Sequence, residues 1–130
     1  MRAVDTNVLV RLIADDDTVQ VGIAERLTLE PFIILPTVVL ETVWVLEKTY
    51  RMPPIEVSGR LGVLLGNVNA IVVSGGAIEW AFARYEAGAD FADALHIALA
   101  RDANADRFAT FDRGIAKSIS ETPVELETLS

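Results

Sequence analysis

Four carboxylates stand in or beside expected secondary-structure elements, where they could take part in one reaction. They are Asp5, Glu41, Asp93 and Asp112. Carboxylates about 4 Å apart repel each other by roughly 1–4 kcal/mol at surface-like dielectrics, so a cluster of them needs a cation or shared protons. Oxygen ligands at an open site suit Mg²⁺ or Mn²⁺, and such ions can activate water for attack on phosphorus. If the four residues converge, they predict metal-dependent hydrolysis of a phosphodiester.

Each carboxylate also has an ordinary structural explanation. Asp5 could cap a helix or a turn. Asp90 at a helix N-cap, with Asp93 three residues later, would form a capping pair that needs no chemistry. Glu41 could lie on a narrow solvent-exposed stripe of an otherwise apolar helix, and Asp112 could be a turn residue. The order of the elements must therefore show whether the four side chains can meet.

Short apolar runs typical of buried strands alternate along the chain with helical patterns. The expected strands cover residues 2–6, 32–35, 70–73, 107–111 and 124–126. The expected helices cover residues 7–13, 19–30, 37–50, 55–67, 77–87, 91–103 and 113–118. This alternation predicts an α/β three-layer sandwich around a mostly parallel sheet of four to five strands. Ligands of such sheets bind beyond the carboxyl ends of the strands, where Asp5 and Asp112 are expected.

Capping residues predict where several helices begin and end. Residues with capping side chains precede three expected helices: Thr6 or Asn7, Asp17 or Thr18, and Thr37. Asp15 belongs to the turn expected before the second helix, and Gly88 is expected to end the helix over residues 77–87.

The composition limits the class of protein. At 130 residues the chain is about one domain long, so residues 1–130 are expected to form a single domain. The absence of cysteine excludes disulfides and thiolate metal sites and suits a cytoplasmic location. No apolar run reaches the roughly 18 residues of a membrane span, and the start of the chain lacks the apolar segment of a signal peptide.

The net charge of −8 argues against binding nucleic acid by bulk electrostatics and favours a basic protein partner. A nucleic-acid substrate would require metal ions and a local group of basic residues. The candidates for such a group are Arg84, Arg101, Arg107, Arg113 and Lys117. Most of them could equally be ordinary solvated charges on the surface. The aromatic residues Trp44, Trp80 and Phe82 could anchor a partner surface, although helical spacing is also typical of core residues.

The chain resembles the PIN-domain ribonucleases, and among them the VapC-like toxins of prokaryotic toxin–antitoxin pairs. The resemblance rests on four segments in a fixed order: "VDTNVLVRL", "VLETVWVL", "DFADALHIALA" and "ATFDRGIAK". It implies a metal-dependent endoribonuclease that acts as a toxin and uses Mg²⁺ or Mn²⁺. It also implies RNA as substrate, a cognate antitoxin that inserts a segment near the acidic pocket, and a homodimer.

The resemblance assigns roles to individual residues as well. It implies that the acidic quartet at the catalytic site consists of Asp5, Glu41, Asp93 and Asp112, with Asp5 and Asp93 as the metal ligands. Asn7 and Thr110 would orient the carboxylates or the attacking water. Asp90 falls outside the quartet, as an additional outer acid or only as the helix cap.

Two other functions fit parts of the pattern. An aspartyl-phosphate phosphatase would use Asp5 as nucleophile, but Asn7 stands where the usual second aspartate would be. A non-catalytic PIN-like module would keep the fold and the acids while sequestering RNA or a protein. His96 is the single histidine, matches no ligand position, and is expected to pack on an inner or interface face of its helix.

Overall fold

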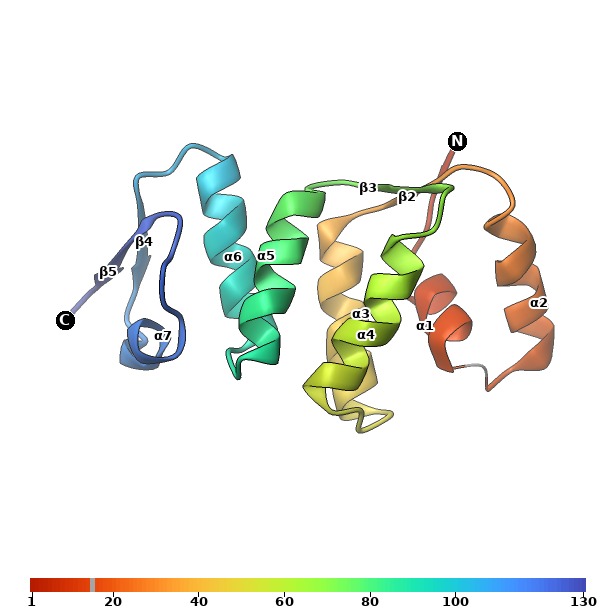
Figure 1. The fold of residues 1–130 in the computed structure, drawn as a ribbon, viewed down its shortest axis with the longest axis horizontal. Helices are drawn as coiled ribbons and strands as arrows, with labels where there is room; N and C mark the ends of the chain where they lie inside the picture. Colours follow the sequence, from red (N-terminus) through yellow and green to blue (C-terminus); the bar gives the residue numbers. More distant parts are fainter. Residues whose placement is uncertain (15) are drawn as a thin grey trace. The chain divides into compact units, whose positions relative to one another are not determined.

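The computed structural model describes residues 1–14 and 16–130, so Asp15, in the expected turn, lies outside the described residues. The chain forms two compact units, which Figure 1 colours in sequence order: Met1–Val73, here called unit 1, and Ser74–Ser130, here called unit 2. The expectation of one domain over residues 1–130 stays a prediction.

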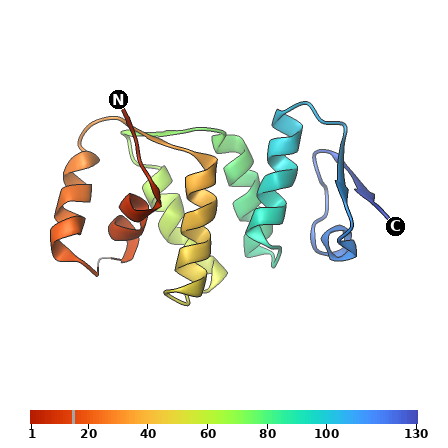
Figure 2. The ribbon, with the colours of Figure 1, turned by 180° about the vertical axis from the view of Figure 1, so that it is seen from behind.

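Unit 1 carries a parallel three-stranded sheet with helices between its strands. Its elements are β1 (Arg2–Ala3), α1 (Thr6–Ala14), α2 (Thr18–Leu27), β2 (Phe32–Ile34), α3 (Pro36–Lys48), α4 (Pro54–Leu65) and β3 (Ala70–Val72). The strand order is β1-β2-β3, and central Phe32 lies opposite Arg2 on one side and Ala70 on the other. α1 packs against α2 and α3, and α3 lies beside α4 in both views of the ribbon (Figures 1 and 2).

The core of unit 1 follows from the apolar spacing in its sequence. On α3, Val39, Val43 and Leu46 recur every three to four residues and are buried on one face of the helix. In β2, Phe32 and Ile34 are fully buried. Each such side chain stabilises the fold by about 1.5–3 kcal/mol relative to exposure.

The caps of the first three helices confirm one prediction and correct two. Asp17 caps α2 as expected, since its carboxylate accepts the N–H of Gln20 at 3.0 Å. For α1 the capping carboxylate is that of Asp5, which accepts the N–H of Asn7 at 3.0 Å, so the expectation of Thr6 or Asn7 as the cap is wrong. Thr37 does not cap α3 either. That helix already begins at Pro36, whose fixed φ and missing N–H suit the first helical position.

A hydrogen-bonded group joins the end of α3 to the segment between α1 and α2. The Tyr50 hydroxyl donates to Asp16 Oδ2 at 2.6 Å, and Arg11 Nη1 donates to Asp16 Oδ1 at 2.6 Å. Arg11 Nε also donates to Gln20 Oε1 at 2.6 Å. The Tyr50 hydrogen bond, helped by the positive charge of Arg11, holds the pKa of Asp16 below its ordinary value.

We expect Tyr50→Phe to lower the melting temperature at pH 7, with a gap to the wild type that narrows in acid. Because the pKa of Asp16 is lowered by folding, its contribution is present above the ordinary aspartate pKa of about 3.9 and is lost as the pH falls through the folded value. Thermal unfolding followed by circular dichroism between pH 7 and pH 3 measures this gap. A gap of the same size across that range would contradict the role given to the hydroxyl.

Unit 2 consists of a helical hairpin followed by a parallel pair of strands. Its elements are α5 (Gly75–Glu86), α6 (Phe91–Asp102), β4 (Arg107–Thr110), α7 (Arg113–Ser118) and β5 (Glu125–Thr128). α5 and α6 lie side by side (Figures 1 and 2), and Arg107 of β4 pairs with Glu125 of β5. As predicted, Gly88 lies just beyond the end of α5, where its φ of 109° suits a residue without a side chain. The rings of Phe82, Tyr85 and Phe91 pack with centroids 4.7–6.5 Å apart and form the centre of the hairpin.

The α/β class and the parallel pairing of strands are confirmed. The five strands found within residues 1–14 and 16–130 are divided between a three-stranded sheet in unit 1 and a two-stranded sheet in unit 2. The expectation that residues 70–73 form a buried strand is wrong, because Ile71 of the edge strand β3 is 45% exposed. None of the helices within the described residues is long and apolar enough to cross a membrane.

Candidate functional site

Three acidic residues of unit 2 interact electrostatically. Asp90 and Asp93 lie one turn apart at the start of α6, and Asp112 follows β4. Burial raises the pKa of Asp93 above its ordinary value, and the negative charges of Asp90 and Asp112 raise it further. A half-buried carboxylate near two like charges favours a bound proton or a cation. The structure therefore places Asp93 and Asp112, of the third and fourth acidic motifs, within range of each other's charge.

Local hydrogen bonds fix the backbone that carries these acids. The carboxylate of Asp90 accepts the N–H of Asp93 at 3.1 Å, which confirms the capping pair. Asp112 Oδ1 accepts the N–H of Gly114 at 2.8 Å, so Asp112 is also the N-cap of α7. The N–H of Asp112 in turn donates to the hydroxyl of Thr110 at 2.9 Å. Thr110 thus positions the segment that carries Asp112.

His96 lies one turn after Asp93 on α6, and its side chain is exposed. The expectation that His96 packs on an inner face of its helix is therefore wrong within unit 2, and the alternative of an interface face stays a prediction. Its charge lowers the pKa of Asp93 and so offsets part of the effect of burial and of the two carboxylates. The i, i+3 spacing of Asp93 and His96 was the sequence signal that could have placed the imidazole beside the acids.

Asp5 and Glu41 belong to unit 1. Asp5 is exposed and holds the first turn of α1 through one carboxylate oxygen, and the exposed side chain of Asn7 follows it in that turn. Glu41 is exposed on α3, on a solvent-facing stripe that it shares with Trp44 and Lys48. The structure thus places Glu41 where a surface glutamate would lie, and its part in chemistry stays a prediction.

The oxygen donors of these residues suit a hard divalent cation such as Mg²⁺ or Mn²⁺. Within each unit, among the residues that the structure describes, no three acidic or imidazole side chains are grouped closely enough to hold a metal ion. The raised pKa of Asp93 nevertheless means that a cation beside it would relieve an existing repulsion. The donor chemistry therefore fits such an ion, and the ligand set stays a prediction.

A protein-family model described as "PIN domain" matches residues 2–118. The chain belongs to the PIN domain family. No curated protein sequence matches this PIN-domain chain. It is similar to a solved structure, the VapC20 toxin of Mycobacterium tuberculosis, described as cleaving the sarcin–ricin loop. The two are 21% identical, and the match covers 95% of this chain and 100% of the other with a TM-score of 0.43.

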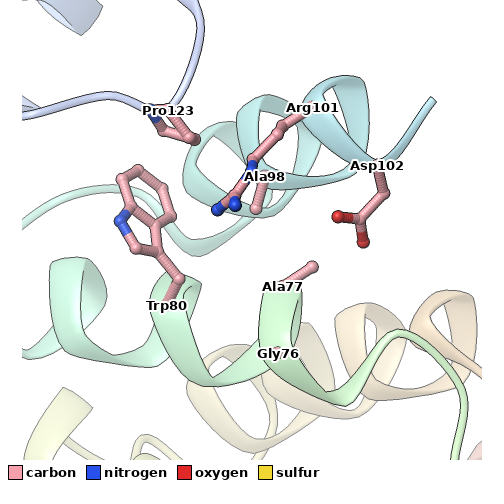
Figure 3. Close-up of a pocket in the computed structure, with 7 residues that line it drawn as sticks. All are labelled: Gly76, Ala77, Trp80, Ala98, Arg101, Asp102 and Pro123. Carbon is pink, nitrogen blue, oxygen red and sulfur yellow. The ribbon is translucent and has the colours of Figure 1, made fainter. Parts of the chain in front are cut away.

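Sequence reasoning missed one further feature of this PIN-domain chain. Trp80 and Arg101 were noted separately, and Asp102 was not singled out, yet all three line one pocket of unit 2 (Figure 3). No local pattern signals this grouping, because it depends on how α5 and α6 are rotated against each other.

Proposed function

We propose that this PIN-domain chain is a metal-dependent endoribonuclease, the toxin of a toxin–antitoxin pair. The observation that carries the proposal is the interacting group of Asp90, Asp93 and Asp112, in which the pKa of Asp93 is raised by burial and by two like charges. Such repulsion destabilises the folded chain, and a bound cation would relieve it. Membership of the PIN domain family supports the same assignment.

In the proposed reaction the acidic quartet acts as one group. Asp5 and Asp93 would hold a Mg²⁺ or Mn²⁺ ion, with Glu41 and Asp112 completing the acidic environment. When bound, such an ion supplies water activation and neutralises charge that develops on the phosphate. Thr110 would keep Asp112 in place through the hydrogen bond described above, and Asn7 would orient the carboxylates from the first turn of α1.

The proposal extends to the partners and organisation of the protein. One family model spans both units, which supports the prediction that they belong to a single domain. The net charge of −8 favours an antitoxin whose contacting segment is basic. The resemblance of the four motifs also supports RNA as substrate, a homodimer, and action in the cytoplasm.

The test is whether one metal both catalyses and stabilises. We expect purified protein to cut single-stranded RNA with Mn²⁺ or Mg²⁺ and not with a chelator. Because an ion bound only by the folded state adds about 2.7 kcal/mol at a hundred times its Kd, Mn²⁺ should raise the melting temperature by several degrees. Asp93→Asn is the matched control and should show a smaller rise.

Two results would contradict the proposal. A wild-type protein that neither cuts RNA nor melts at a higher temperature with Mn²⁺ has no shared metal site. A protein that binds RNA without cutting it, and whose cellular effect survives Asp5→Asn, is a non-catalytic binding module instead.

A further inference from the structure

A pocket of about 350 Å³ opens between α5 and α6 in unit 2 (Figure 3). Its small lining residues are Gly76, Ala77 and Ala98, none of which has a side chain beyond Cβ. The larger side chains of Trp80, Arg101 and Asp102 project around this space in the close-up. The volume of this space lies within the range of small-ligand sites.

Trp80 gives the pocket a flat aromatic surface. Its indole is half-buried, and the guanidinium carbon of Arg84 lies 4.7 Å from the ring centroid. That cation–π contact holds the ring in place and puts a positive charge next to it. Arg84 covers one face of the ring, so a planar aromatic group such as a nucleobase would stack on the other face.

Arg101 and Asp102 add hydrogen-bonding groups of opposite kind. Both side chains are exposed, and neither has an ion pair or side-chain hydrogen bond to any residue that the structure describes. Five N–H donors and a carboxylate acceptor are thus available to a ligand.

We propose that this pocket binds a guanine base of the RNA substrate, stacked on Trp80. The guanidinium fork of Arg101 matches the adjacent O6 and N7 acceptors of guanine. The carboxylate of Asp102 matches the N1–H and N2–H donors on the pairing edge of the same base. Adenine offers one acceptor and one donor to these groups, so it should bind about tenfold more weakly.

This inference rests on the proposed function and deepens it. Asp93 and Asp102 are nine residues apart on the continuous helix α6, which places the pocket about 14 Å along the helix from the acidic group. Positions nine residues apart face opposite sides of a helix, so an RNA strand that joins the two places must also pass around α6 and needs more than about four nucleotides. The pocket would therefore select RNA with an unpaired guanine more than about four nucleotides from the cut bond.

Trp80 itself supplies the measurement. The chain has two tryptophans, and Trp44→Phe removes the exposed one in unit 1, so that the fluorescence of the variant reports on Trp80. In chelator-containing buffer we expect GMP to quench this fluorescence saturably, with AMP, CMP and UMP requiring at least about tenfold higher concentrations. Arg101→Gln and Asp102→Asn should each weaken the effect of GMP about tenfold or more.

The control is the Trp80→Phe variant, which keeps only Trp44. The fluorescence of Trp44 should not respond to GMP. Circular dichroism checks that every variant is folded. The proposal is overturned if millimolar GMP gives no saturable quenching, if all four nucleotides quench equally, or if Arg101→Gln and Asp102→Asn leave the response to GMP unchanged.

The outcome is separable from that of the proposed function, because nucleotide binding is measured without metal or cleavage. Asp93→Asn should keep the response to GMP although it loses cleavage. If RNA is never cut while GMP binds, the nuclease proposal fails and the guanine pocket stands. If RNA is cut and GMP does not bind, only the pocket is refuted.

Discussion

Asp93→Asn should lower the rate of RNA cleavage by at least about a hundredfold while the protein stays folded. Asparagine keeps the shape of the side chain but removes the charge that would hold a divalent ion. The backbone N–H of residue 93 still donates to Asp90, so the start of α6 is preserved. Initial rates on a single-stranded RNA with Mn²⁺ measure the loss, and circular dichroism checks the fold.

The same variant should melt at a higher temperature than the wild type at neutral pH without metal. Folding raises the pKa of Asp93, so its charged form costs stability, and the cost grows as the pH rises from the ordinary aspartate pKa of about 3.9 to the raised value. The raised pKa also means that burial and the two like charges outweigh the attraction of a helix N-terminus for an anion. The difference in melting temperature between Asp93→Asn and the wild type should disappear when the pH is below the ordinary aspartate pKa.

Asp106→Asn is the matched control for this charge change. Asp106 is exposed in the loop between α6 and β4, and its backbone carbonyl, which the substitution leaves intact, pairs with Glu125. Cleavage by this variant should equal that of the wild type. An Asp93→Asn protein that still cuts RNA at the wild-type rate would refute the assignment of Asp93.

Local features of the sequence predicted most elements of both units. Phe32 lies in a short apolar run closed by Pro36, and such runs are typical of buried strands. Asp17 and Asp90 have side chains that satisfy free N–H groups at a helix start, and each caps the expected helix. The caps are predictable because the interactions that form them lie within four residues along the chain. The strand is predictable because its apolar run is itself a local pattern, although its partners Arg2 and Ala70 are distant in the sequence.

Features that depend on contacts between elements could not be predicted in this way. The exposure of His96 and Ile71 depends on which faces of α6 and β3 other elements cover, and periodicity does not give that. Trp80 and Arg101 share a pocket only because two helices pack with a particular rotation. The part of Asp5 and Glu41 in chemistry is harder still, because each also fits an ordinary place on its helix.

Whether Asp5 of unit 1 and Asp93 of unit 2 act in one reaction can be tested with a double-mutant cycle. We expect Asp5→Asn alone to lower kcat/KM on RNA by at least about a hundredfold, as Asp93→Asn does. The fold of α1 should survive, because asparagine is as good an N-cap as aspartate and its amide oxygen can still accept the N–H of Asn7.

The double variant should then be no slower than the slower single variant. Groups that serve the same step are strongly non-additive, since the step is already lost when one of them is removed. Independent contributions would instead multiply, to about ten-thousandfold for two hundredfold losses. Glu25→Gln, which removes an exposed carboxylate from α2, is the control. Added to Asp5→Asn or to Asp93→Asn, it should not change the cleavage rate of that variant.

A multiplicative loss in the double variant would contradict the proposal that these two carboxylates hold one metal ion. A non-additive loss would mean that residues from both units act on one phosphodiester. Adding Glu41→Gln to the wild type, to Asp5→Asn and to Asp93→Asn would then decide whether the exposed glutamate of α3 belongs to the same group. A surface glutamate without a catalytic role would leave the cleavage rate of each of these proteins unchanged.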